Sequence, residues 1–217
     1  MKLLQTAWET VLDALFPKRE RIAALEKLSV DELLNLLPPA SLPPGGDGIF
    51  PLFDYHNERV RTIVWEIKYR HNRRLIGRMA ELLHQEMLES ASDFASMGGL
   101  PPLLVPIPTS AARRRERGGS QTELLAEAIA KMEIGSIAEY APNALMKVRE
   151  TESQTALSRA KRLRNLVGTF EADKVAVSGR DILLLDDVVT TGATIAEAKR
   201  ALREAGAGEI LSFAISH

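Results

Sequence analysis

The chain has 217 residues, of which 45% are hydrophobic and 26% are charged, so it can bury a full hydrophobic core. Its 28 Lys and Arg residues against 29 Asp and Glu give a formal net charge of −1, so any affinity for nucleic acid must come from a local basic patch. Disulfides and thiolate zinc sites are excluded because there is no cysteine, and no apolar run approaches the roughly 18 residues of a membrane span, so we expect a cytoplasmic protein without a transmembrane segment.

The first part of the chain predicts helices followed by a linker. Apolar residues at three- and four-residue spacing on both sides of Pro17 predict amphipathic helices, and Ser29 with Glu32 has the spacing of a capping box. The proline- and glycine-rich residues 38–46 are typical of a linker. We therefore predict a helical extension over residues 1–46 that packs on the remaining domain or on a second subunit, with a membrane surface as the alternative.

Residues 47–217 alternate strand and helix patterns, which indicates an α/β domain with a parallel sheet flanked by helices. Between the first two strands, Asn57 is expected to cap a helix that ends in Lys68-Tyr69-Arg70. The expected strands are Ile49–Tyr55, Leu103–Pro108, Leu145–Val148, Ile182–Leu185 and Ile210–Ile215.

The stretch after the Ile182–Leu185 strand has the composition of a phosphate-binding turn. Asp186 and Asp187 stand at the carboxyl end of the strand, and a turn rich in threonine leads from them into a helix. That turn consists of Val188, Val189, Thr190, Thr191, Gly192, Ala193 and Thr194. Backbone N–H groups, threonine hydroxyls and the positive end of the helix dipole can together hold a 5′-phosphate, with Gly192 permitting close approach or a positive φ.

The two carboxylates have a different expected partner from the turn. They repel a phosphate, so Asp186 and Asp187 suit the hydroxyls of a ribose, with Mg²⁺ alongside. The alternative interpretation is that they merely end a strand and that Thr191 caps the helix. The strand, both acids, three threonines and the glycine occur together, which favours a phosphate site, and the absence of a G-x-x-x-x-G-K-[ST] sequence argues against a P-loop.

Two basic segments complete the candidate site. The donors that begin with Lys68 lie at a helix C-terminus, where a solvated basic cap is the alternative interpretation. Arg115 and Arg117 belong to the arginine- and glycine-rich residues 113–121, which directly follow a strand and are predicted to form a mobile lid over an anion. A nucleic-acid surface is the competing interpretation of residues 113–121, but no aromatic residues are interleaved there for stacking.

Together these motifs resemble those of the ComF-type phosphoribosyltransferase-like proteins, relatives of amidophosphoribosyltransferase. The resemblance covers residues 49–217 and rests on Phe53-Asp54-Tyr55, Lys68-Tyr69-Arg70, Val105-Pro106-Ile107-Pro108, Arg115-x-Arg117-Gly118-x-x-Gln121, Arg149-x-Thr151-x-x-Gln154, Arg162-x-x-Asn165 and residues 186–194, in that order. It implies a type I phosphoribosyltransferase fold that binds 5-phosphoribosyl-1-pyrophosphate (PRPP). It also implies that the Lys-Tyr-Arg segment is the pyrophosphate loop and the arginine-rich segment the flexible catalytic loop.

The resemblance implies a division of roles among these residues. The catalytic residues that it implies are Lys68, Arg115, Arg117, Asp186 and Asp187. The PRPP-binding residues that it implies are Asp186, Asp187, Val188, Val189, Thr190, Thr191, Gly192, Ala193 and Thr194, with Tyr69 and Arg70. The residues that it implies as Mg²⁺ ligands are Asp186 and Asp187.

Two hypotheses for function follow from the resemblance. In the first, the protein is an enzyme that transfers phosphoribosyl from PRPP to an acceptor such as a nucleobase or ammonia. In the second, it is a non-catalytic module that keeps the PRPP site to bind a nucleotide or single-stranded DNA. The resemblance further implies a link to DNA uptake in natural competence, with single-stranded DNA, the competence helicase machinery and a second copy of the chain as candidate partners.

The chain departs from the family pattern in two places. The family usually begins with a four-cysteine zinc module, whereas residues 1–48 contain no cysteine, so we expect no zinc. Gly119-Ser120 stands where the family tends to carry an aromatic residue and Asn, so we expect no stacking contact there with an acceptor base.

Overall fold

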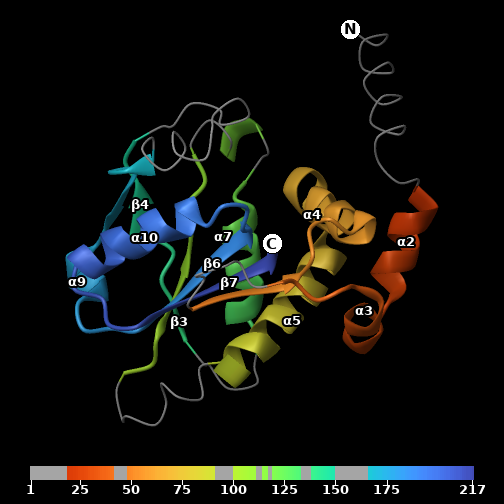
Figure 1. Ribbon diagram of the computed structural model, residues 1–217, viewed down its shortest axis with the longest axis horizontal. Helices are drawn as coiled ribbons and strands as arrows, with labels where there is room; N and C mark the ends of the chain where they lie inside the picture. Colours follow the sequence, from red (N-terminus) through yellow and green to blue (C-terminus); the bar gives the residue numbers. More distant parts are fainter. Residues whose placement is uncertain are drawn as a thin grey trace, which may run out of the picture.

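The computed structural model describes residues 19–41, 48–90, 100–110, 114–116, 119–132, 138–149 and 166–217. The helices are α2 (Arg19–Lys27), α3 (Val30–Leu36), α4 (Glu58–Arg70), α5 (Arg73–Ser90), α7 (Gln121–Ala130), α9 (Lys174–Val177) and α10 (Ala193–Glu204). The strands are β1 (Ile49–Phe53), β2 (Leu103–Pro106), β3 (Glu139–Tyr140), β4 (Leu145–Lys147), β5 (Phe170–Ala172), β6 (Ile182–Val188) and β7 (Ile210–Ser216). Figure 1 shows their arrangement.

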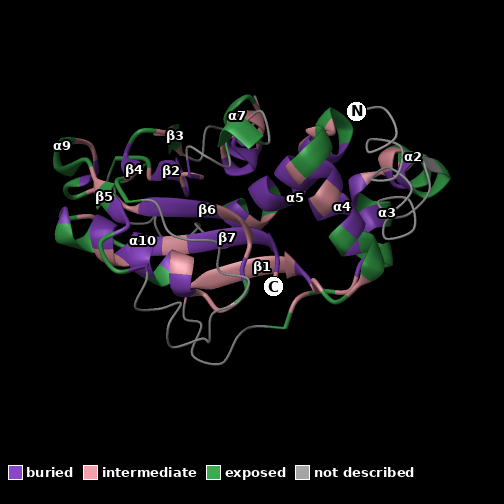
Figure 2. Cartoon of the chain, turned by 90° about the horizontal axis from the view of Figure 1, so that it is seen from above, coloured by how far each residue is buried: buried purple, intermediate pink, exposed green. Residues whose placement is uncertain are grey.

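Five strands form a parallel sheet in the order β1-β7-β6-β2-β3, which confirms the predicted α/β fold of a parallel sheet flanked by helices. The central strand β6 explains why both faces need cover. Leu183 and Leu185 pack with α4, α5 and α7, while Ile182 and Leu184 pack with α10, because successive side chains of a strand point to opposite faces. In Figure 2, β6 and β7 are mostly buried and β1 is partly buried.

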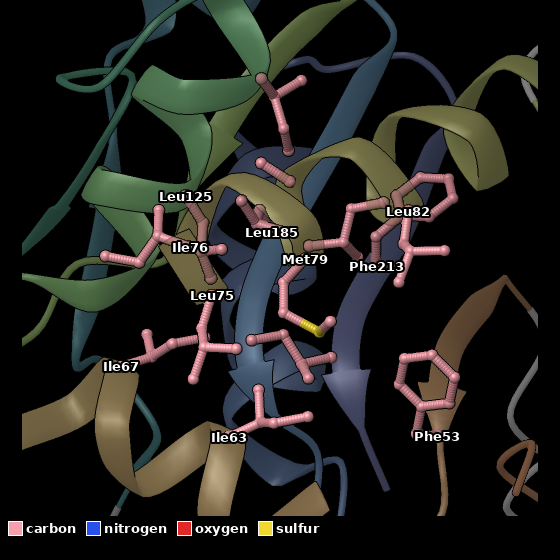
Figure 3. Packing of buried hydrophobic residues seen from close by; sticks show 14 of the residues in the cluster. Phe53, Ile63, Ile67, Leu75, Ile76, Met79, Leu82, Leu125, Leu185 and Phe213 are labelled. Atoms are coloured by element: carbon pink, nitrogen blue, oxygen red, sulfur yellow. The ribbon is translucent and has the colours of Figure 1, made fainter. Parts of the chain in front are cut away.

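The larger core lies between the sheet and α4, α5 and α7. The inner face of α4, with Ile63 and Ile67, meets Leu75 and Met79 of α5 against Phe213 of β7 (Figure 3). All five side chains are at most 1% exposed, so each contributes about 1.5–3 kcal/mol through burial. This core holds α4 against the sheet and thereby fixes where its C-terminal end lies.

Local capping agrees with the sequence. Ser29 Oγ accepts from the N–H of Glu32 at 3.2 Å, and Glu32 Oε2 accepts from the N–H of Ser29 at 2.7 Å, which confirms the capping box. Asn57 Oδ1 accepts from the N–H of Arg59 at 2.9 Å, which confirms the predicted start of α4. That helix ends at His71, which has a left-handed φ of 47°.

The expected strand over Leu145–Val148 does not join the main sheet. Its residues form β4, which pairs antiparallel with β5 in a separate two-stranded sheet that packs on α10. The fifth strand of the main sheet is instead Glu139–Tyr140, which pairs with β2. The strand predicted over Leu145–Val148 is thus confirmed as β4, whereas β3 was not predicted, because a two-residue strand is too short to produce a hydrophobic pattern.

The N-terminal helices pack on the α/β domain. Leu25 of α2 and Leu33 of α3 belong to the same buried cluster as the inner face of α5. After α3 the chain runs along the sheet edge, where the N–H of Ala40 donates to the carbonyl of Leu52 at 3.0 Å. The boundary at residue 46 stays a prediction, and the predicted helix before Pro17 lies outside the described residues. None of the helices described here is long and apolar enough to cross a bilayer.

Candidate functional site

A polar cavity lies at the carboxyl ends of β2 and β6. These strands are parallel neighbours, so the residues that follow them meet at one edge of the sheet, where open α/β sheets bind ligands. The cavity measures about 290 Å³, and its wall includes Asp186, Asp187, Thr190 and Thr194 after β6, and Thr109 after β2. The cavity therefore brings together the residues predicted to bind a phosphate and those predicted to bind a ribose.

A larger cavity of about 630 Å³ lies between α2, α3 and α4, and we do not assign it the chemistry. Its wall is mainly apolar, with Leu25, Leu28 and Leu36. Its rim includes the Arg21–Glu58 ion pair, whose side chains are both mostly exposed. Its wall contains the carboxylate of Glu58, which is paired with Arg21, and not two adjacent carboxylates as in the smaller cavity.

The two carboxylates differ in their surroundings. Asp187 Oδ2 lies 3.1 Å from Lys68 Nζ, and these side chains are 15% and 20% exposed. Asp186 Oδ1 accepts from the N–H of Asp187 at 2.8 Å. Burial raises the pKa of Asp186 to about 7, helped by the negative charge of Asp187. A cation beside the carboxylates would offset this penalty, so the pair has the chemistry to hold Mg²⁺.

The turn after β6 has the shape that its composition predicts. Gly192 is the N-cap of α10 with a φ of 72°, and no side chain caps the helix at that residue. Thr191 Oγ1 accepts from the N–H of Ala193 at 3.4 Å, while Thr190 and Thr194 line the cavity. The N-terminus of α10 thus faces the cavity with its positive dipole end and two hydroxyl residues, a combination suited to an anion.

The backbone conformation of Gly192 favours glycine, and no neighbouring protein atom adds a steric requirement. A Cβ there would meet nothing nearer than Ile49 Cδ1 at 4.0 Å. We therefore expect Gly192→Ala to cost about 1–2 kcal/mol in the free energy of unfolding, the cost of a left-handed residue, with Gly192→Asn costing less. Urea unfolding measures this. Gly77→Ala in α5 is the control, since a Cβ there meets nothing within 4 Å and alanine should stabilise the helix. Equal losses at both glycines would contradict the assignment.

The predicted basic residues divide between the cavity and the surface. Lys68 lines the cavity. Tyr69 is 50% exposed, and Arg70 is exposed as well, although its Nη1 lies 3.6 Å from Oε1 of the buried Glu66. Tyr69 and Arg70 are not among the residues that line the cavity. Val188 lines the cavity, whereas Val189 and Ala193 are buried in the protein and do not line it.

The arginine-rich segment is only partly described. Arg115 is exposed in a short helical stretch over 114–116, where Arg114 pairs with Glu123 of α7. Arg117 and Gly118 lie outside the described residues, as do the predicted motif residues over 150–165. The assignment of Arg115 and Arg117 to a lid therefore stays a prediction.

Several wall residues were not predicted as site residues. Gln121 at the start of α7 donates from Nε2 to the carbonyl of Lys68 at 3.1 Å, which ties α7 to the end of α4. Lys147 and Phe170 reach the cavity from the β4–β5 hairpin, and Tyr55 from the loop after β1. Gln121 belongs to the family motif and could have been chosen, but Lys147 carries no such signal because only the hairpin brings it here.

Comparison with known proteins identifies the family. DNA utilization protein YhgH of Salmonella typhimurium is 30% identical over 168 residues, which is 77% of this chain and 71% of that protein. Competence protein F of Haemophilus influenzae is 32% identical over 114 residues, covering 51% and 48% of the two chains. Competence protein ComFC of Streptococcus pneumoniae is 36% identical over 111 residues, covering 51% and 46%. No protein-family model matches the chain. The chain belongs to the ComF family.

Two solved structures are more distant. Glutamine PRPP amidotransferase from B. subtilis, complexed with ADP and GMP, matches with a TM-score of 0.38 and 20% identity over 64% of this chain. An allosteric regulatory enzyme of purine biosynthesis matches with a TM-score of 0.39 and 21% identity over 65%. The matched region spans 26% of each of those chains, and likeness at this level carries no argument about a ligand.

Proposed function

We propose that the cavity at the ends of β2 and β6 binds PRPP together with Mg²⁺, and that the protein transfers the phosphoribosyl group to an acceptor. The observation that carries the proposal is the pair Asp186 and Asp187 beside the Gly192 turn, on the wall of one cavity that also contains Lys68. A turn suited to a phosphate directly follows two carboxylates suited to sugar hydroxyls, and this combination suits a sugar phosphate.

Each part of PRPP has a matching group. The 5′-phosphate would lie at the N-terminus of α10, against Thr190 and Thr194. The ribose hydroxyls would face Asp186 and Asp187, which would also hold Mg²⁺. Bound Mg²⁺ would neutralise part of the pyrophosphate charge.

Among the basic residues that the structure describes, Lys68 is well placed to interact with the leaving group. Departure of pyrophosphate leaves an oxocarbenium-like ribose, so the protein must neutralise charge and hold the sugar still. Lys68 lines the cavity, and its Nζ is paired with the carboxylate of Asp187. The backbone carbonyl of Lys68 accepts a hydrogen bond from Nε2 of Gln121, which holds this end of α4 in place. A small rotation of this side chain would let the ammonium group interact with a pyrophosphate oxygen.

We also propose that this activity serves the handling of DNA. The names of the relatives refer to DNA utilization and to competence, and these are properties of those proteins. The alternative to transfer is a module that binds PRPP or a nucleotide without turnover. Release of pyrophosphate from PRPP distinguishes a transferase from a module that only binds.

Thermal unfolding with PRPP and Mg²⁺ tests the binding proposal. Ligand at about 100 times its Kd should raise the free energy of unfolding by roughly 2.7 kcal/mol. Asp186→Asn with Asp187→Asn should abolish the rise, whereas Asp31→Asn, at an exposed position in α3, should keep it. An unchanged melting temperature in the wild-type protein, or an equal rise in the double variant, would refute the proposal. Release of pyrophosphate with candidate bases then separates an enzyme from a binding module.

A further inference from the structure

The apolar cavity of about 630 Å³ lies where α2, α3 and α4 meet, and these helices are side by side in Figures 1 and 2. It is here called the N-terminal groove. Its lining includes Ala24, Leu25 and Leu28 of α2, Leu36 of α3 and Thr62 of α4. Leu36 is 36% exposed although its side chain is large and apolar. An apolar surface gathered in one hollow is typical of a site that another element covers.

The residues of α2 that line the groove share one face of that helix. They follow one another at spacings of three and four residues, at which side chains lie on the same side: Arg21, Ala24, Leu25 and Leu28. Ala24 is exposed and small, so a second helix can approach α2 closely there. This face of α2 therefore has the pattern of a helix–helix contact.

The segment that precedes α2 has a matching pattern in its sequence. Residues 1–18 lie outside the described residues. Their apolar residues alternate at spacings of four and three: Leu4, Trp8, Val11 and Leu15. This is the seam of a helix that packs along another helix at a shallow angle. Only Pro17 and Lys18 separate this segment from α2, and a connection of two to five residues is enough to join antiparallel helices.

A turn at residues 17–18 would bring the two patterns into register. Positions equally distant from residue 18 come level with each other in an antiparallel pair. Leu12 then faces Ala24, and Trp8 faces Leu28. The largest side chain of the seam thus meets the groove where α2 contributes a leucine, and a medium-sized side chain meets the small alanine.

Charge at the rim favours the same occupant. Residues 4–16 contain two acids, Glu9 and Asp13, and no base. Arg21 and Arg59 lie on the wall of the groove, and both are exposed. Exposed ion pairs contribute little to affinity, so the opposite charges would mainly fix the orientation of the segment.

We propose that residues 4–16 dock in the N-terminal groove of the same chain, as a helix antiparallel to α2. The apolar seam covers the groove and extends the core that Leu25 and Leu33 share with α5. A short linker holds a segment at an effective concentration of about millimolar, so at micromolar protein a second copy competes poorly for the groove. The proposal goes beyond PRPP binding and does not depend on it.

Disulfide trapping in the full chain tests the proposal, because the protein contains no cysteine of its own. Leu12→Cys with Ala24→Cys should form an intrachain disulfide under mild oxidation, since facing residues of packed helices bring their Cα atoms to about the 4.4–6.8 Å that the bond requires. Val11→Cys with Ala24→Cys covers a register one residue away. At about 10 µM protein the intrachain product should exceed the interchain product roughly 100-fold.

Ala23→Cys is the matched control for Ala24→Cys. It is also an exposed alanine of α2, at the adjacent position, but it does not line the groove. Paired with Leu12→Cys or Val11→Cys, it should form the intrachain disulfide far more slowly. Tryptic mapping of the oxidised protein identifies the linked residues.

Trp8 fluorescence reports the same contact without a cross-link. In a Trp65→Phe background Trp8 is the one tryptophan left, and docking should shield it from acrylamide. Leu36→Asp places a charge in the groove, so it should raise the quenching constant several-fold and shift the emission to longer wavelength. Leu34→Asp, on the same helix at a position 47% exposed, does not line the groove and should change neither quantity. Circular dichroism melting shows whether each variant keeps the fold.

Three results would overturn the proposal. Equal intrachain disulfide formation with Ala23→Cys and Ala24→Cys would show that the segment is not held on this face. Disulfides formed mainly between chains would place the segment in the groove of a second copy. Trp8 emission that responds to phosphatidylglycerol vesicles and not to a folded Leu36→Asp variant would assign the seam to a membrane surface. The disulfide result stands by itself if Leu36→Asp fails to fold.

Discussion

Asp186→Asn should make the protein more stable at about pH 8 in the absence of PRPP and Mg²⁺, while abolishing their binding. The reason is that the folded protein raises the pKa of Asp186 from 3.8 to about 7, through burial and the charge of Asp187. At a pH above 7 the carboxylate is ionised at an energetic cost in the folded state that the unfolded chain does not pay. Asparagine keeps the shape and an oxygen for the N–H of Asp187, without the charge.

The pH dependence has a definite sign. Because the folded pKa of Asp186 is raised, the destabilising contribution of this one group is absent below about pH 4 and grows as the pH rises toward and through 7. The stability gain of Asp186→Asn should therefore be absent near pH 4 and reach a plateau above pH 7. Each pKa unit corresponds to about 1.4 kcal/mol, so a gain of a few kcal/mol is expected. Chemical unfolding across this pH range measures it.

Asp187→Asn is the matched control at the next residue. It removes the partner of Lys68, whose side chain is 20% exposed, so it should destabilise the protein. It also removes a charge that raises the pKa of Asp186, so the pKa of Asp186 should fall in this variant. A stability gain that is the same for both variants, or independent of pH for Asp186→Asn, would contradict the proposed electrostatics of the site.

Leu33→Ala should destabilise the whole protein by about 2–5 kcal/mol, although Leu33 lies in the predicted N-terminal extension. Its side chain is 0% exposed and belongs to the buried cluster that reaches α5 and the sheet. The cost comes from lost burial and from the cavity that alanine leaves. Thermal unfolding should show one transition, shifted to lower temperature for the entire chain.

Leu34→Ala is the control at the adjacent position. Leu34 is 47% exposed, so its truncation should change the free energy of unfolding by much less than that of Leu33. If Leu33→Ala shifts only a minor early transition and leaves the main one unchanged, α3 folds separately from the α/β domain. The predicted boundary at residue 46 would then also be a boundary of cooperative unfolding.

The site elements that lie close together in the sequence could be predicted from it. The strand β6, both acids and the Gly192 turn are continuous in sequence, and each depends on local properties: an apolar run, charged residues at its end and a residue that tolerates a positive φ. The caps at Ser29 and Asn57 were predictable for the same reason, since a cap involves residues within one helical turn.

The tertiary structure decided which distant groups meet. Lys68 was predicted for pyrophosphate, but only the packing of α4 on the sheet places its ammonium group on Asp187. Leu145–Lys147 has the apolar pattern of a sheet strand, yet β5 pairs with it in a separate hairpin that carries Lys147 to the cavity. A hydrophobic pattern predicts that a segment is buried. Which strands pair and which charged side chains come into contact depend on the register and packing of all the elements together.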